Sequence, residues 1–212
     1  MTPKELIEHI KSKQLEETVF ILGGGPSLLK YLPDPKILSC RPVIAINNAY
    51  KIAPDAVVCL FADRFWWEQH KAIIRQYYKG QIVTCAVRPE IFFKAENIIH
   101  FHQGLKTGGI CEDADKLCGN NGGHYAINLA VNFGFKRIVL IGFDMQHKNN
   151  SAKTHWHQEH IRETNTQLYA GTMIPGMEKI VPFQEKLGFT VFNVNPDSAV
   201  KCFQFADITS FI

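Results

Sequence analysis

Three histidines close together in the last third of the chain are the residues best suited to acid–base chemistry. His155, His157 and His160 lie in a polar stretch. Histidine titrates near neutral pH, so one of them could take the proton from an attacking hydroxyl group. The spacing His-x-His-x-x-His, with Asp144 or His147 nearby, could instead hold zinc, although no His-Glu-x-x-His helix accompanies it. Solvated loop histidines are the third interpretation.

A glycine loop follows the first apolar run of the chain. Val19-Phe20-Ile21-Leu22 is typical of a buried strand, and Gly23-Gly24-Gly25-Pro26-Ser27-Leu28 follows it directly. Such strand-to-helix turns hold phosphate on exposed backbone N–H groups, and we expect a positive φ at Gly25. The loop is no dinucleotide fingerprint, because Leu28 replaces the third glycine, and no P-loop lysine follows. It predicts nucleotide contacts at Gly23, Gly24, Gly25 and Ser27, with a ligand-free turn as the alternative.

Polar side chains also stand where later apolar runs end, at Asn47, Asn48, Asp63 and Asp144. Parallel strands place their carboxyl ends at one edge of a sheet, so we expect these side chains to gather there. Asp144 could orient a histidine or a ribose hydroxyl, or only make a loop hydrogen bond. Asp63-Arg64 could neutralise a phosphate through the arginine or be an exposed pair.

Apolar runs alternate with helical periodicity, which predicts an α/β fold with a mainly parallel, Rossmann-like sheet flanked by helices. Expected strands cover 19–22, 42–46, 56–60, 81–86, 97–101, 137–141 and 190–194. Expected helices cover a capped N-terminal segment after Thr2, then 65–78, the region of 126–133, and 176–187. The chain of 212 residues predicts one domain, with a polar, mobile lid at about 145–175.

Composition narrows the class of partner. The net charge of +3 suits a small anionic substrate and is too weak to indicate nucleic acid. Six cysteines without a Cys-x-x-Cys predict reduced core residues in a cytoplasm. No apolar run reaches membrane-spanning length.

Several motifs, in the same order along the chain, resemble those of the small bacterial sialyltransferases. They are the glycine loop, Ala45–Tyr50, Gly122–Ile127, the run 134–144 and Asn195-Pro196-Asp197-Ser198. The same motifs occur in a broader, often phage-encoded group named for similarity to 6-hydroxymethylpterin diphosphokinase. Thr154-His155-Trp156-His157 looks most like that group.

The resemblance implies a CMP-sugar held by the glycine loop, by Asn47 and by Asn121-Gly122-Gly123. It also implies a lid histidine as general base, His155 first and His157 second. The chain departs from the family at Gly24, where the sialyltransferases have Asn, and at Asn121-Gly122, where they have Thr-Ser. Both changes remove side-chain donors, so backbone N–H groups would have to hold the nucleotide.

The implied activity is inverting, metal-independent transfer from a nucleotide-sugar, the donor being a substrate and no further cofactor being expected. The partners would be that nucleotide-sugar, a small-molecule or glycan acceptor and, for an oligomer, further copies of the chain.

A diphosphokinase-like phosphotransferase is the alternative. It needs Mg²⁺ and convergent carboxylates, for which Asp63 and Asp144 are the candidate pair. A phage protein that binds a nucleotide without turnover is the third hypothesis.

Two other patterns are interpreted structurally. Trp66, Trp67, Tyr77 and Tyr78 could stack a sugar or a base, but helical aromatics favour the core. Asp113-Ala114-Asp115 has the form of a glycosyltransferase metal motif, yet it follows no strand and is interpreted as solvated surface.

Overall fold

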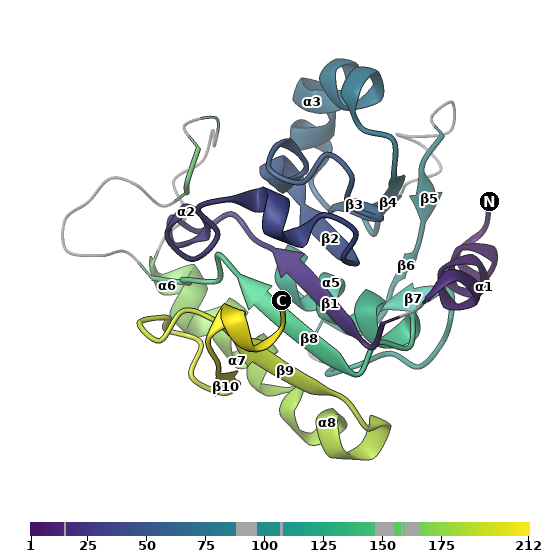
Figure 1. Ribbon diagram of the computed structural model, residues 1–212. Coiled ribbons are helices and arrows are strands. Elements are labelled where there is room, and N and C mark those ends of the chain that lie inside the picture. Colours follow the sequence, from purple (N-terminus) through teal and green to yellow (C-terminus); the bar gives the residue numbers. More distant parts are fainter. Residues whose placement is uncertain (15, 88–96, 107, 147–154, 158, 160–165) are drawn as a thin grey trace.

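A parallel sheet of eight strands forms the centre of the protein (Figure 1). The computed structural model describes residues 1–14, 16–87, 97–106, 108–146, 155–157, 159 and 166–212. The strand order is β10-β9-β8-β1-β2-β3-β4-β5, and every neighbouring pair is parallel. The α/β, Rossmann-like fold class predicted from the sequence is confirmed.

The sheet strands are β1 (Thr18–Leu22), β2 (Val43–Ile46), β3 (Val58–Phe61), β4 (Gln81–Thr84), β5 (Ile99–His100), β8 (Arg137–Ile141), β9 (Thr190–Asn193) and β10 (Gln204–Phe205). A separate pair is formed by β6 (His102–Gln103) and β7 (Lys116–Leu117). The α-helices are α1 (Pro3–Lys13), α2 (Leu28–Tyr31), α3 (Arg64–Tyr77), α5 (Gly122–Asn132), α6 (Thr166–Leu168), α7 (Ile174–Glu178) and α8 (Val181–Leu187). Shorter helical turns are η1 (Pro35–Leu38), η2 (Asn47–Lys51), the π-helical η3 (Tyr169–Met173) and η4 (Ile208–Ser210).

Apolar layers cover both faces of the sheet. Val19 and Ile21 of β1 join a cluster that contains residues of α1 and α5, whereas Phe20 and Leu22 join a cluster that contains residues of α2 and α3. Successive strand side chains point to opposite faces, so a strand covered on both sides is apolar throughout. This is why the strands appear in the sequence as continuous apolar runs rather than alternating ones.

The chain reverses its direction of travel across the sheet at β1. It runs from β1 through β2, β3, β4 and β5, then returns to place β8 on the other side of β1. Ligands of open α/β sheets bind outside the carboxyl ends of the strands at such a reversal. The topology therefore directs attention to the loops after β1 and β8.

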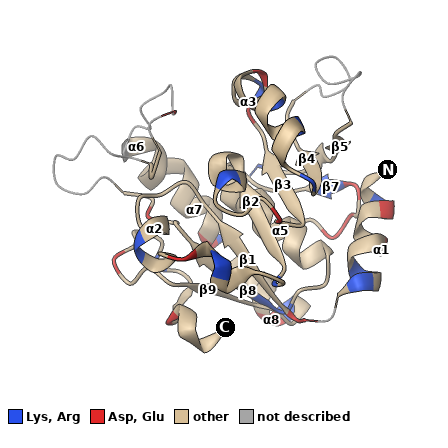
Figure 2. Cartoon of the chain, turned by 45° about the horizontal axis from the view of Figure 1, so that its top comes forward, with Lys and Arg blue, Asp and Glu red and all other residues tan. Residues whose placement is uncertain are grey.

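The N-terminal helix begins as its sequence predicts. The Thr2 hydroxyl accepts from the Glu5 N–H at 3.3 Å, and the Glu5 carboxylate accepts from the Thr2 N–H at 2.8 Å, which completes a capping box. Charges of both signs occur on α1 and α3 (Figure 2). In α1 the acid lies in the first turn and lysines in the last, which complements the helix dipole.

Two predicted boundaries are wrong. The helix expected over 176–187 is two helices, α7 and α8, because each begins with a proline, Pro175 or Pro182, whose missing N–H suits a helix start. Residues 166–175, expected to belong to the lid, are helical.

The six cysteines are free, and Cys59, Cys85 and Cys118 are buried as predicted, whereas Cys40 is exposed. Within the described ranges, no helix is both long and apolar enough to cross a membrane.

Candidate functional site

The glycine loop after β1 lies against the residues that follow β8. The Gly23 N–H donates to the Ile141 carbonyl at 2.8 Å, and the Gly25 N–H donates to the Gly142 carbonyl at 2.9 Å. A Cβ on Gly23 would lie 2.7 Å from the Gly142 oxygen, and one on Gly25 would lie 2.0 Å from Asp144 Oδ2. Glycine is required here by close approach of neighbouring groups. The expected positive φ at Gly25 is wrong; it occurs at Gly142, with φ 78°.

Asp144 ties the glycine loop to the C-terminal part of the chain. Its Oδ2 accepts from the Ser27 hydroxyl at 2.7 Å and from the Ser27 N–H at 3.2 Å, while its Oδ1 accepts from Asn195 Nδ2 at 3.1 Å. The carboxylate is 5% exposed. Of the two roles considered for Asp144, these contacts support the loop hydrogen bond. Asn195, the first residue of Asn195-Pro196-Asp197-Ser198, thus contacts the same carboxylate as Ser27 of the glycine loop.

A polar cavity of 190 Å³ opens beside this loop. Its lining includes three separate segments that were predicted to form the site: Gly23–Gly25, Asn47 and Asn121–Gly123. We call this space the polar cavity. The predicted site segments at the ends of β1 and β2 and at the start of α5 are thus brought together. Tyr169 and Met173 of η3 also line it, and no sequence pattern indicated them beyond their position in the expected lid.

Helix α5 begins at the wall of the polar cavity. Asn121 caps the helix, because its Oδ1 accepts from the His124 N–H at 3.1 Å. The first helical residues, Gly122 and Gly123, carry no side chain that could cover their N–H groups. An anion in the cavity would face the positive end of the helix dipole.

Asn47 is strained and carries an unsatisfied acceptor. Its φ is 50°, a left-handed conformation that Asn tolerates better than most residues. Its Oδ1 is buried and has no hydrogen-bond partner among the described residues. Buried polar atoms are normally paired, so an N–H or O–H donor of a ligand could complete this site.

A second cavity, of 290 Å³, lies next to the first and shares Gly24, Ile46, Asn47 and His155 with it. We call it the aromatic cavity because Phe65 and Trp66 line it. Its other lining residues are Asn48, Asp63, Gln69, His157 and Glu159. The sequence pattern did not single out Gln69 or Glu159.

Asp63 and Asn48 have structural partners that limit their predicted ligand roles. Asp63 caps α3, because its Oδ1 accepts from the Phe65 N–H at 2.8 Å. Asn48 is 2% exposed, and both ends of its amide are hydrogen-bonded within the protein. Both residues line the aromatic cavity rather than the polar one.

Residues 155–157 and 159, which we call the strap, cross the glycine loop. The Trp156 N–H donates to the Gly24 carbonyl at 3.0 Å. A Cβ on Gly24 would lie 2.9 Å from His155 Cδ2, so the imidazole rests on the bare face of the loop. His155 and His157 are neighbours, with ring centroids 5.4 Å apart. The rest of the predicted lid, residues 147–154, 158 and 160–165, and with it His147 and His160, lies outside the described residues.

Glu159 holds the strap to the body of the protein. Its Oε2 accepts from Asn48 Nδ2 at 2.8 Å, and its two oxygens accept from Lys51 Nζ at 2.8 and 2.6 Å. The Lys51 hydrogen bond lowers the pKa of Glu159. His70 Nε2 lies 3.8 Å from the same carboxylate, and burial lowers the pKa of His70. Trp66 Nε1 completes the network by donating to Asn48 Oδ1 at 2.5 Å.

The other aromatic and acidic candidates divide between core and surface. Trp67 and Tyr78 are buried, as predicted, and Tyr77 is exposed. Trp66 departs from that prediction, because it stacks on His70 and lines the aromatic cavity. Asp113 is exposed and paired with Lys116 at 2.8 Å, which agrees with its interpretation as solvated surface.

The described residues do not fit a divalent metal site. They include no group of three or more His, Cys, Asp or Glu side chains arranged to hold an ion. Asp144 already accepts three hydrogen bonds and Asp63 caps a helix, so the candidate carboxylate pair is committed elsewhere.

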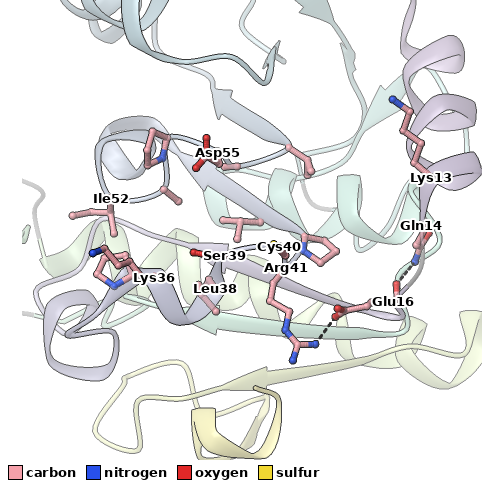
Figure 3. Close-up of a pocket in the computed structure, with 17 residues that line it drawn as sticks. Lys13, Gln14, Glu16, Lys36, Leu38, Ser39, Cys40, Arg41, Ile52 and Asp55 are labelled. Carbon is pink, nitrogen blue, oxygen red and sulfur yellow. Dashed lines mark hydrogen bonds and ion pairs between the residues drawn. The ribbon is translucent and has the colours of Figure 1, made fainter.

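A larger cavity, of 520 Å³, lies at the opposite edge of the sheet, near the amino ends of β2 and β3 (Figure 3). Lys13, Lys36 and Cys40 line it, and Arg41 pairs there with Glu16 at 2.8 Å. None of the predicted site residues reaches it, and it lies away from the reversal of the chain.

The fold and these paired cavities define an α/β protein with a candidate ligand site at the carboxyl edge of its sheet. The model of the family described as 6-hydroxymethylpterin diphosphokinase MptE-like matches residues 1–150, and the chain belongs to this family. No curated protein matches the chain.

Solved structures of bacterial sialyltransferases share the fold at low identity. The α-2,3-sialyltransferase Cst-I from Campylobacter jejuni matches with 14% identity over 91% of this chain and 81% of its own, with a TM-score of 0.59. A variant of the sialyltransferase CstII in complex with CMP matches with 16% identity over 92% and 88%, with a TM-score of 0.57. CstII from the same organism with the substrate analogue CMP-3FNeuAc matches with 16% identity over 90% and 86%, with a TM-score of 0.53.

Proposed function

We propose that the protein is a transferase that moves a sugar from a nucleotide-sugar to an acceptor hydroxyl, with inversion and without a metal ion. The observation that carries this proposal is the position of His155, which lines the polar and the aromatic cavity at once. A base between two substrate spaces is what a two-substrate transfer requires.

The polar cavity is the proposed nucleotide site. Its walls are the glycine loop and the start of α5, which suit a phosphate. Asn47 would accept a hydrogen bond from the nucleotide or the sugar through its unpaired Oδ1. CstII has been solved with CMP and with CMP-3FNeuAc, so CMP is the first nucleotide to test.

The aromatic cavity is the proposed place of the acceptor, with Trp66 and Phe65 as walls. In the transfer step the acceptor oxygen forms a bond to the anomeric carbon as His155 takes the hydroxyl proton. The bond from that carbon to the nucleotide phosphate oxygen breaks, and the nucleotide leaves with the electron pair. Attack from the face opposite the leaving group inverts the configuration.

A diphosphokinase-like phosphotransfer is the second candidate, favoured by the description of the family. That reaction depends on Mg²⁺ held by carboxylates. Asp63 and Asp144 are committed to other hydrogen bonds, which is why glycosyl transfer is preferred.

The test compares His155→Ala with the wild type in CMP binding by calorimetry and in turnover of CMP-sugars with a panel of acceptors. We expect turnover to fall by about a hundredfold with little change in CMP affinity, because only the base is lost. His102→Ala, at the exposed end of β6, is the matched control.

Three results would contradict the proposal. Full turnover by His155→Ala would show that His155 is not the general base. Activity with ATP that disappears on chelation would favour the phosphotransferase. CMP binding without turnover of any CMP-sugar would favour the nucleotide-binding protein.

A further inference from the structure

We propose that Asn48 and Glu159 lock His157 as the tautomer with its proton on Nε2, so that His157 is a hydrogen-bond donor in the site and not its base. Asn48 and Glu159 are then positioning residues that act through the imidazole. The tautomer follows from the hydrogen bonds alone, whereas the assignment of the base to His155 rests on the proposed function.

The orientation of the Asn48 amide is determined from both ends. Trp66 Nε1 can only donate, and it lies 2.5 Å from Asn48 Oδ1. An ionised Glu159 carboxylate can only accept, and it lies 2.8 Å from Asn48 Nδ2. A flipped amide would set donor against donor and acceptor against acceptor at a residue that is 2% exposed. The Asn48 nitrogen therefore faces Glu159.

The ionised state of Glu159 is secured by the charged groups around it. Lys51 Nζ contacts both carboxylate oxygens, at 2.6 and 2.8 Å. His70 Nε2 stands 3.8 Å from the same carboxylate, and His157 is a further titratable neighbour of it. Lysine keeps its positive charge at neutral pH, so the pair favours the carboxylate over the carboxylic acid.

Asn48 Nδ2 has two hydrogens, and the second partner is His157. Its Nδ1 lies 3.3 Å from Asn48 Nδ2. Since the amide nitrogen can only donate, His157 Nδ1 must accept, and the proton of the neutral ring is on Nε2. The ring nitrogen with the lone pair is thus already occupied. To take a proton at that nitrogen, His157 would have to give up its bond to Asn48.

Long-range ¹H–¹⁵N NMR of the histidine rings in the full, unliganded chain tests the tautomer directly. The chain has nine histidines, and His157→Gln assigns the relevant signal by its disappearance. At neutral pH we expect an unprotonated Nδ1 and a protonated Nε2 for His157. A protonated Nδ1 with an unprotonated Nε2, or a fully protonated ring, would overturn the inference.

Asn48→Leu removes the amide that fixes the ring, and we expect the His157 signals to move to the mixture of tautomers of an unconstrained imidazole. Buried His124, whose Nε2 lies 2.6 Å from the Gly109 carbonyl, reports in the same spectrum that the fold is intact. Unchanged His157 signals in a folded Asn48→Leu protein would show that Asn48 does not set the tautomer.

A second variant, Glu159→Gln, removes the charge that orients Asn48, and we expect a partial shift of the His157 signals in the same direction. Glu112→Gln is the matched control, because Glu112 forms an exposed ion pair with Lys186 at 2.5 Å elsewhere. A shift of equal size in both proteins would overturn the role of Glu159.

The NMR experiment contains no substrate, so its outcome is independent of turnover. If the tautomer is as stated and His155→Ala keeps full activity, the proposed function fails and the tautomer stands. If His157 carries its proton on Nδ1, the tautomer fails whatever the kinetics of His155→Ala show.

Discussion

The glycines of the loop after β1 differ in the atoms that lie closest to each of them. Among the described residues, a Cβ on Gly24 would meet only the His155 ring, at 2.9 Å, whereas a Cβ on Gly25 would meet Asp144 at 2.0 Å and the Gly142 carbonyl at 2.6 Å. A side chain on the strap can move, but the backbone after β8 cannot. Neighbouring glycines in one motif therefore differ in role. Gly24 leaves room for the side chain of the proposed base, and Gly25 leaves room for the Asp144 carboxylate and the Gly142 carbonyl.

Gly24→Ala should move His155 while leaving the protein stable. A displacement of about 1 Å at a catalytic group can cost on the order of a hundredfold in rate, so we expect turnover to fall at least about tenfold. The midpoint of thermal unfolding should barely change. Gly171→Ala is the control, because a Cβ there lies within 4 Å of no atom in the part of the chain that the structure describes. Wild-type turnover in Gly24→Ala would show that the base does not rest on this loop.

Gly25→Ala should instead destabilise the whole protein. The new methyl group would displace the Asp144 carboxylate from Ser27, and overpacking of this kind costs about 1–3 kcal/mol. Urea unfolding measures the loss. If Gly25→Ala were as stable to urea as Gly24→Ala, the loop after β1 and the residues after β8 would have to move apart at little cost in free energy.

The residues at strand ends could be predicted from the sequence, but their partners could not. Asn47, Asp63 and Asp144 were found because each follows an apolar run. That Asp144 binds Ser27 depends on β1 and β8 being neighbours, and that is set by the order of the strands. Glu159 carried no signal of its own, because its role arises only where the strap meets Lys51 and Asn48.

At the scale of elements, the start of α5 combines a structural and a proposed binding role, and one substitution can separate them. Asn121→Asp keeps an N-cap of equal quality and loses the hydrogen bond from Asn121 Nδ2 to Asn120 Oδ1, so stability should fall less than on loss of the cap, while a negative charge is placed at the wall of the polar cavity. We expect CMP affinity to fall about tenfold, as for a like-charge contact near 1.4 kcal/mol.

Asn121→Ala tests the helix cap without adding a charge. It removes the cap and should cost about 1 kcal/mol of stability, with a smaller effect on CMP. Calorimetry and urea unfolding of the two variants give the comparison. Equal loss of affinity in both would show that the cap, and not the charge, matters for binding.

The strap should respond to pH through Glu159. The hydrogen bond from Lys51 holds the pKa of Glu159 below its ordinary value. Contact of the strap with the body of the protein therefore contributes stability that is present above the ordinary pKa and is lost as the pH falls through the lowered pKa. The Trp156 indole signal in NMR should therefore move over this acidic range. Lys51→Met should shift that transition to higher pH, whereas a transition unaffected by Lys51→Met would exclude this contact as the anchor.

Elements with strong periodicity were predictable, and those held by tertiary contacts were not. The buried strands and α3 appear from apolar runs and helical spacing within one or two residues. Residues 166–175 form α6, η3 and the start of α7, although their polar sequence suggested a lid. Their helices are short, and packing rather than intrinsic propensity must stabilise them.

At the scale of the whole molecule, the site divides into two parts along the sequence. The family model covers residues 1–150, which include the glycine loop, Asn47 and the start of α5. The strap with His155, His157 and Glu159 follows that region. Alternation of strands and helices predicted the sheet, whereas the return of the chain to β8, which creates the site beside β1, is visible only in the fold.

This division predicts that binding and turnover can be separated. CMP at a hundred times its Kd should stabilise the wild type by about 2.7 kcal/mol, seen as a higher unfolding temperature. His155→Ala should keep that stabilisation and lose turnover, whereas Asn121→Asp, with its tenfold weaker affinity, should keep only about half of it, about 1.4 kcal/mol at the same CMP concentration. Lys36→Ala, in the large cavity at the far edge of the sheet, should change neither. If Lys36→Ala abolished the CMP effect, the nucleotide would bind at the amino edge, and the carboxyl-edge site would have to be abandoned.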